Sequence, residues 1–152
     1  NVMSGVRLSK SILPRMLANN WGRVLFISSE CASLTPPDLI AYSMTKAAIL
    51  AVSRGLAQLT KGTNVTVTSI IPGSTLSEGA EQFIEDAAQK GQKTKDEIEN
   101  AFFIEVRTSS LLQRFAKVEE VADTIAYIAS PRSSATNGAA IKVDGGSSGG
   151  LF

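Results

Sequence analysis

The stretch RVLFIS, Arg23 to Ser28, is a continuous apolar run with the length of one β-strand. Such a run is typical of a strand that is buried on both faces within a parallel sheet. The stretch NVTVTSIIPG, residues 64–73, is interpreted as a second buried strand that ends in a Pro-Gly pair. A third strand is expected in AAIKVDGG, residues 139–146, which ends in two glycines. These three segments decide the fold class.

Helical patterns alternate with the three strands. Apolar residues recur with helical spacing from Val2 to Leu17, an alanine-rich helix is expected from about Leu39 to Thr60, and an amphipathic helix from Glu119 to Ala129. Residues 29–38 read as a loop. This alternation predicts parallel strands joined by right-handed crossovers, with helices on both faces. We therefore expect an α/β fold with a Rossmann-like, doubly wound parallel sheet of about three strands.

A charged insert, residues 78–107, separates the second strand from the last helix and contains few strand formers. Thr94 followed by Glu97 is a capping-box pattern and predicts the start of a helix within the insert. Insertions of this length are often mobile covers over a binding site. Three apolar residues near its end either line a substrate pocket or seat the cover on the body: Phe102, Phe103 and Val106.

The composition excludes several classes of protein. A chain of 152 residues suits one domain, and its formal net charge of +1 provides no broad basic surface for nucleic acid or an anionic membrane. No apolar run is long enough to span a membrane. The chain has no histidine and a single cysteine, Cys31, so we expect no metal site and a cytoplasmic rather than a secreted setting.

Tyr42 and Lys46 lie four positions apart in the stretch AYSMTK, at the start of a predicted helix, so their side chains share one face. An ammonium near a tyrosine favours the phenolate and lowers its pKa. The pair could therefore act as an acid or base near neutral pH. The same spacing is common by chance, and a surface tyrosine beside a solvated lysine is the alternative.

Further polar residues follow the ends of the first two strands. Ser29 comes directly after the first strand, and ligands of open parallel sheets bind outside the carboxyl ends of the strands. Its hydroxyl and that of Tyr42 could therefore grip one carbonyl oxygen. After the second strand, Gly73 would let a flat ring approach the backbone, and the hydroxyls of Thr75 and Ser77 could bind a carboxamide or a phosphate. Plain strand-ending turns are the alternative in both places.

Taken in order, these motifs resemble the short-chain dehydrogenase/reductase family over essentially the whole chain. The matching stretches are NVMSG, LPRM, GRVLFISS, YSMTK, IIPGSTLS, RFAKVEEVADTIAYIAS and TNGAAIKVDGG. The part from TSSLLQRF through VDGG is most similar to bacterial oxidoreductases of the 3-oxoacyl-carrier-protein reductase type. The resemblance implies an oxidoreductase that uses NAD or NADP and acts on a small carbonyl or alcohol substrate. It leaves open which of the two nucleotides is used.

The resemblance also implies roles for single residues. Tyr42 is the acid or base on the substrate oxygen, Ser29 hydrogen-bonds that oxygen, and Lys46 lowers the tyrosine pKa and holds the nicotinamide ribose. Asn1 anchors a water in a proton relay to the lysine. The insert at residues 78–107 matches the variable substrate lid. Four residues flank the nicotinamide: Pro72, Gly73, Thr75 and Ser77.

The family's first half, with the glycine-rich turn that holds the pyrophosphate, has no counterpart here, because DGGSSGG precedes no helix. We therefore expect residues 1–152 to be a partial domain, the second and catalytic half of the fold. The alternative is a truncated, inactive fragment that serves only as an oligomerisation module. In the family, helices matching residues 2–17 and 39–60 form a dimer interface, so we expect a homo-oligomer through them.

Overall fold

The computed structural model describes residues 1–150; Leu151 and Phe152 of the expected partial domain lie outside the described residues. A central sheet of three parallel strands has the order β1-β2-β5. Its strands are β1 (Gly22–Ile27), β2 (Val65–Pro72) and β5 (Ala140–Val143). This arrangement confirms the predicted α/β fold with three parallel strands.

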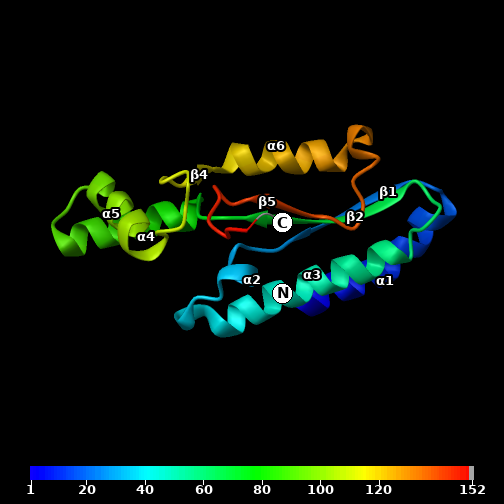
Figure 1. Ribbon diagram of the computed structural model, residues 1–152, viewed down its shortest axis with the longest axis horizontal. Coiled ribbons are helices and arrows are strands. Elements are labelled where there is room, and N and C mark those ends of the chain that lie inside the picture. The colour runs from blue at the N-terminus through cyan, green and yellow to red at the C-terminus, as the bar shows by residue number, and fades with distance from the viewer. Residues whose placement is uncertain (151–152) are drawn as a thin grey trace.

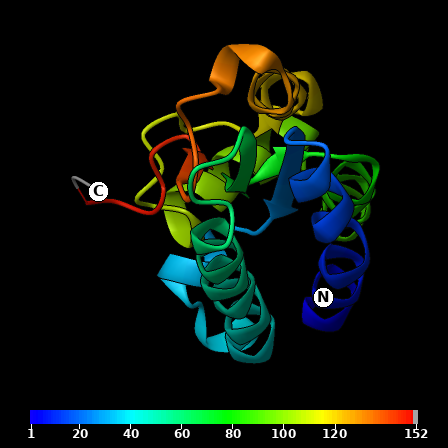
Figure 2. The ribbon, with the colours of Figure 1, turned by 90° about the vertical axis from the view of Figure 1, so that its right-hand side faces the viewer.

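Helices cover both faces of this sheet (Figures 1 and 2). Helices α1 (Val2–Ala18) and α3 (Ile40–Gln58) lie on one face, and α6 (Val118–Ala129) lies on the other. The short helix η3 (Pro131–Ser133) follows α6. The three layers are those predicted from the alternation of helical and strand patterns. Within residues 1–150, no helix has both the length and the apolar character needed to cross a bilayer.

Strand β2 is the centre of the sheet. It pairs with β1 from Val65 opposite Gly22 to Ile70 opposite Ile27, and its last four residues pair with β5. Residues 65–71 are all buried, since strands flank β2 on both sides and helices cover both faces. The polar residues Thr66, Thr68 and Ser69 are therefore buried together with the apolar ones, as expected for a central strand that is covered on both faces.

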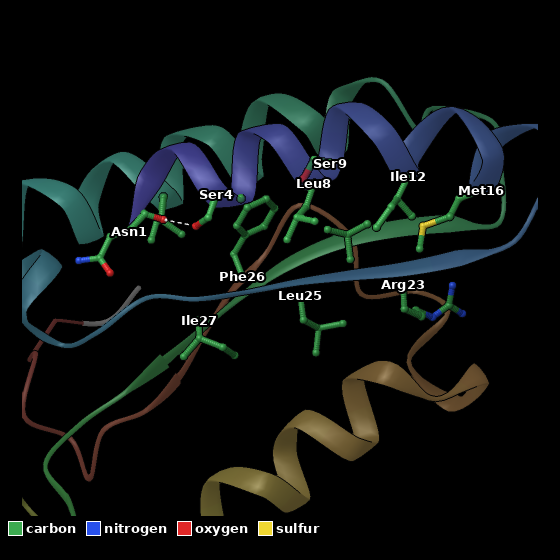
Figure 3. A pocket seen from close by; sticks show the side chains of 13 residues that line it. Asn1, Ser4, Leu8, Ser9, Ile12, Met16, Arg23, Leu25, Phe26 and Ile27 are labelled. Atoms are coloured by element: carbon green, nitrogen blue, oxygen red, sulfur yellow. Dashed lines mark hydrogen bonds between the residues drawn. The ribbon is translucent and has the colours of Figure 1, made fainter. Parts of the chain in front are cut away.

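The main core lies between the sheet and α3. It contains Phe26 of β1, Val67 of β2, and Ile49 and Ala57 of α3. Figure 3 shows Phe26 directed from β1 toward α1, whereas Leu25 and Ile27 point to the opposite side of the strand. Helix α1 approaches closely because Gly5 faces this ring: a Cβ at Gly5 would lie 2.7 Å from a ring carbon of Phe26.

Strand β1 forms an open edge of the sheet. The N–H groups of Ser28 and Glu30 donate to Ile70 O (2.8 Å) and Pro72 O (2.9 Å), so the even-numbered residues direct their backbone groups toward β2. The backbone groups of the odd-numbered residues therefore point outward, as in any sheet edge. A groove of about 360 Å³ lies between α1 and β1 along this edge (Figure 3). Its lining is mostly apolar.

The insert folds as a separate layer at the carboxyl end of the sheet (Figure 1). It contains α4 (Glu78–Gly91), α5 (Lys95–Ala101) and the π-helix η2 (Phe102–Val106). The capping box predicted at the start of α5 is present: the Thr94 hydroxyl accepts from Glu97 N, and the Glu97 carboxylate accepts from Thr94 N. Two short parallel strands connect this layer to the body, β3 (Thr75–Leu76) and β4 (Ala116–Lys117).

Aromatic residues hold the insert together. Phe103 is only 2% exposed and packs with Ile84 and Phe115. The ring centroids of Phe102 and Phe115 are 5.0 Å apart in a stacked arrangement. Val106, in contrast, is exposed. Of the two roles considered for these residues, the phenylalanines therefore seat the insert.

Residues 29–38 differ from the predicted loop, because they contain α2 (Cys31–Leu34) and the short helix η1 (Pro37–Leu39). Helix α2 is a single turn that ends at Thr35, whose φ of 45° is left-handed. A helix of four residues is too short to show a helical period, so the sequence pattern could not reveal it. The side chain of Cys31 is buried at the start of this turn.

Candidate active site

Tyr42 and Lys46 lie in the first two turns of α3, near the carboxyl end of β1. The Lys46 Nζ is 5.5 Å from the centre of the Tyr42 ring, so the two side chains share one helix face as the spacing predicts. Tyr42 is 38% exposed, which leaves its phenol open to a ligand. The Lys46 ammonium also donates to Ile27 O at 3.1 Å, a carbonyl at the open edge of β1.

Partial burial of the Lys46 ammonium lowers its pKa below the ordinary value of 10.5, because burial disfavours the charged form. The Nζ group lies beside the Tyr42 ring and donates to Ile27 O.

Ser29 lies in a segment that is fixed on two sides. The Ser28 hydroxyl donates to Lys46 O (2.8 Å), which ties this segment to α3, while Glu30 N donates to Pro72 O (2.9 Å) and ties it to β2. Between these anchors, the Ser29 Oγ accepts a hydrogen bond from Cys31 N at 3.2 Å. Because this bond uses only an acceptor site, the Ser29 hydroxyl proton remains available to a ligand.

Asn1 is connected to the first turns of α3 by hydrogen bonds through Thr45. Its Nδ2 donates to the Thr45 hydroxyl (3.1 Å), and that hydroxyl donates to Tyr42 O (2.7 Å). Figure 3 shows Asn1 at the end of the α1–β1 groove. Thr45 was not among the residues singled out in the sequence, although its position three residues after Tyr42 could have indicated a hydroxyl bonded to that carbonyl.

Gly73 follows the last residue of β2, Pro72, and a side chain there would not fit. A Cβ at this position would lie 2.6 Å from the Cα of Asp144 and 2.8 Å from Glu30 Oε2. The sequence suggested that this glycine leaves room for a ligand ring. In the structure, the space on the Cβ side of Gly73 is filled by neighbouring parts of the chain.

Thr75 and Ser77 are both engaged locally. The Thr75 hydroxyl donates to Gly73 O at 3.0 Å. The Ser77 hydroxyl caps α4 by accepting from Ala80 N at 3.4 Å. Each hydroxyl keeps hydrogen-bonding capacity for a ligand: an acceptor site on Thr75 and the hydroxyl proton on Ser77.

One charged pair at this edge could not be found from the sequence. Arg107 Nε lies 2.8 Å from Glu30 Oε1, and the two side chains are 12% and 3% exposed. The partners are separated by more than 70 positions and come together only because the insert folds back onto the end of β1. No local sequence pattern signals such a contact.

The comparisons with known proteins extend over nearly the whole chain. A family model described as enoyl-(acyl carrier protein) reductase matches residues 1–148. The uncharacterized oxidoreductase YvrD of Bacillus subtilis (strain 168) is 49% identical over 146 residues, which are 96% of this chain and 56% of that protein.

Two solved structures share the fold. L-sorbose reductase from Gluconobacter frateurii, complexed with NADPH and L-sorbose, has a TM-score of 0.87 and 27% sequence identity; the match covers 99% of this chain and 56% of that chain. A short chain dehydrogenase/reductase family protein has a TM-score of 0.78 and 28% identity, with coverage of 96% and 54%.

The polar residues lie at the carboxyl edge of the parallel sheet, where α/β proteins with open sheets generally bind their ligands. The family match shows that the chain belongs to the short-chain dehydrogenase/reductase family of oxidoreductases. The chain spans about half the length of the curated relatives it matches.

Proposed function

We propose that this chain is the catalytic half of an NAD(P)-dependent oxidoreductase that moves hydride between a nicotinamide and a carbonyl or secondary alcohol. One observation carries the proposal: Lys46 Nζ lies 5.5 Å from the Tyr42 ring on a helix to which the Ser29 segment is hydrogen-bonded. A phenol, an ammonium and an available hydroxyl at the carboxyl edge of a parallel sheet suit proton transfer to a bound oxygen.

The residues at this edge fit the nicotinamide end of the cofactor. Lys46 has three N–H bonds, and the one directed at Ile27 O leaves others for ribose hydroxyls. Pro72, Gly73, Thr75 and Ser77 would flank the ring. When bound, the nicotinamide supplies or accepts the hydride. NADPH is the nucleotide in the L-sorbose reductase complex, and either NAD or NADP is compatible with the residues of this chain.

In the proposed mechanism, the Tyr42 hydroxyl gives its proton to the carbonyl oxygen during reduction and takes it back during oxidation. Ser29 donates a hydrogen bond to the same oxygen and holds it in place. The Lys46 ammonium, 5.5 Å from the centre of the Tyr42 ring, would stabilise the negative charge that develops on the phenol oxygen as the proton moves. Asn1, held by Thr45, would position a water that renews the proton. The segment 78–107 would cover the substrate.

The test uses the full-length protein that contains this chain. Tyr42→Phe removes only the phenol hydroxyl, so we expect kcat to fall by about 100-fold or more, the usual contribution of a general acid or base. The melting temperature should not change, because this side chain is partly exposed. Tyr127→Phe on α6, where the tyrosine is also exposed, is the matched control. Turnover that survives in Tyr42→Phe would refute the mechanism.

The substrate class needs a separate measurement. The full-length protein is offered acyl, sugar and steroid ketones, each with NADH and with NADPH. A preference for acyl ketones would agree with the resemblance to 3-oxoacyl-carrier-protein reductases, and a preference for sugar or steroid ketones would not. Oxidation of either nucleotide only in the presence of a ketone would support the proposal, and no oxidation with any of the three classes would count against it.

A second proposal concerns assembly. An apolar groove of about 360 Å³ lies between α1 and α3 on the outside of the molecule, lined by Val6, Leu13, Leu17, Val52, Leu56 and Leu59. Leu59 is 63% exposed. We propose that these helices pack against those of a second copy, since an apolar groove in water is stabilised when it is covered.

A further inference from the structure

We propose that Glu30 is a positioning residue for the oxidoreductase reaction proposed above, on which this inference rests. Its buried carboxylate joins three segments at the carboxyl edge of the sheet: the Ser29 segment, the turn at Gly73 and Ser74, and the C-terminal end of the insert 78–107. The seating of the insert and the placement of Ser29 therefore depend on each other.

The contacts of Glu30 come from all three segments. Its Oε1 is 2.8 Å from Arg107 Nε and accepts a hydrogen bond from the Ser74 hydroxyl at 3.1 Å. Its own N–H donates to Pro72 O at 2.9 Å, directly before the Gly73 turn. Because the Glu30 side chain is only 3% exposed, these contacts are shielded from water and fix its position.

The environment of the Glu30 carboxylate is not the one expected if its only role were to stabilise the fold. Its second oxygen, Oε2, is buried and has no hydrogen-bond partner within residues 1–150. It faces Gly73, where a Cβ would approach it to 2.8 Å. Unsatisfied buried acceptors are rare and costly, and a buried ion pair seldom stabilises a fold more than apolar residues of similar volume. The unpaired Oε2 and the buried ion pair are both explained if the carboxylate must hold a defined geometry beside Ser29 at the carboxyl edge of the sheet.

Arg107 connects this carboxylate to the body of the insert. It is the first residue after η2, and its N–H donates to Phe102 O at 2.9 Å. Its guanidinium carbon lies 5.7 Å from the centre of the Phe102 ring, which belongs to the aromatic core of the insert. A displacement of the insert therefore moves Arg107 and, through it, Glu30.

Glu30 in turn is adjacent to Ser29 and is the residue that directly precedes α2, at its N-cap position. Its carbonyl accepts hydrogen bonds from Ser33 N (2.9 Å) and Leu34 N (3.0 Å), so the direction of α2 is fixed relative to the backbone of Glu30. The N–H that holds the Ser29 hydroxyl belongs to Cys31, the first residue of that helix. A change in the Glu30 backbone is thus transmitted to the Ser29 hydroxyl.

The experiment compares single and double replacements in the full-length protein. Glu30→Gln and Arg107→Met each leave one partner of the buried pair without the other, so each should lower the melting temperature. The double variant Glu30→Gln/Arg107→Met leaves no unpaired charge at this pair and should regain most of that stability. Its kcat/KM should nevertheless remain about 10- to 100-fold below the wild type, because small misplacements of reacting groups have effects of this size.

Hydrogen exchange without nucleotide provides a readout independent of activity. In the double variant, amides of residues 102–107 and 28–35 should exchange faster than in the wild type, because the ionic contact that joins the two segments is gone. Glu85→Gln is the matched control: it removes an exposed ion pair, Lys95–Glu85, within the same insert and should change neither kcat/KM nor exchange at residues 28–35.

Recovery of both the melting temperature and kcat/KM in the double variant would overturn the inference, because the pair would then contribute only to folding. If the double variant does not fold, Ser74→Ala removes a single hydrogen bond to Glu30, and an unchanged kcat/KM would likewise overturn it. Tyr42→Phe is measured in parallel. Activity in that variant refutes the proposed function itself, whereas an inactive Tyr42→Phe beside a fully active double variant refutes only the role of Glu30.

Discussion

Gly73 is enclosed by backbone on one side and by a carboxylate on another. Its N–H donates to Val143 O at 3.1 Å, which fixes the turn against β5. The Cα and O of Asp144 and the Oε2 of Glu30 all lie within 2.8 Å of the place where a Cβ would be. Backbone atoms of a sheet edge cannot move aside as easily as the end of a flexible side chain.

We therefore expect Gly73→Ala to lower the free energy of unfolding by about 1–3 kcal/mol, the usual cost of an extra carbon in a packed site. Urea denaturation of the two proteins measures the difference. Gly79→Ala is the control, because a Cβ there meets nothing within 4 Å; it should be neutral within about 0.5 kcal/mol or slightly stabilising. Equal stabilities of Gly73→Ala and the wild type would contradict the geometry of the turn.

Lys46 should give stability a specific pH dependence. Burial lowers its pKa in the folded protein below 10.5, so between the lowered pKa and 10.5 the unfolded chain binds more protons than the folded one. Stability from this group therefore rises with pH in that window. The effect is small, because the side chain is only partly buried and water screens it.

In Lys46→Met this contribution is absent, so the free energy of unfolding of the variant should rise less than that of the wild type in the window just below pH 10.5. Parallel urea titrations at several pH values measure this difference. A steeper rise in the variant would show that the environment of Lys46 favours its charged form instead.

The sequence predicted the part of the site that depends on local spacing. Tyr42 and Lys46 share a face because four positions make about one helical turn, and Ser29 follows the strand it was expected to follow. The pair of Glu30 and Arg107 was missed because its geometry depends on how the insert folds. The packing around Gly73 was missed for a similar reason, since Asp144 comes from the far end of the chain.

At the scale of the elements, long periodic segments were predictable and short ones were not. The three parallel strands, the helices α1, α3 and α6, and the capped helix after Thr94 were all predicted, whereas full burial on both faces is found in β2 and not in β1, which is an edge strand. Helix α2 and the strands β3 and β4 have four residues or fewer, so no period can form within them. Their conformation comes from tertiary contacts, such as the hydrogen bond from Ala116 N to Ser74 O at 2.9 Å.

The aromatic core of the insert leads to a prediction about that element. Phe103 is 2% exposed among Ile84 and Phe115, so Phe103→Ala should cost about 3–5 kcal/mol within the insert. Hydrogen exchange should then accelerate across residues 78–107 while β2 stays protected. Phe83→Ala is the matched control, since Phe83 is 60% exposed and its removal should change little. Uniform loss of protection in both regions would mean that the insert and the sheet unfold together.

At the scale of the whole molecule, two surfaces are incompletely covered: the groove between α1 and α3, and the outer side of β1. The sequence predicted a partial domain, and this chain covers about half the length of the curated relatives it matches. Which residues line each groove could not be predicted, because this depends on how α1 lies across the sheet.

The proposed assembly makes a prediction about size. Leu59 lines the groove between α1 and α3 and is 63% exposed, so an arginine there would place a charge in the proposed helix interface. We expect Leu59→Arg to reduce the mass of the full-length protein in sedimentation from that of an oligomer to that of a single chain. Ala122→Arg, at an exposed position of α6, should leave the mass unchanged. A wild-type protein that sediments as a single chain would exclude the interface.

The outward-facing backbone groups of β1 have one more consequence. A parallel strand from a separate polypeptide could pair with β1 at this edge, because strand pairing needs only backbone hydrogen bonds between the two strands. Lys46 would have to release Ile27 O or share it, so completion of the sheet would change the surroundings of the ammonium.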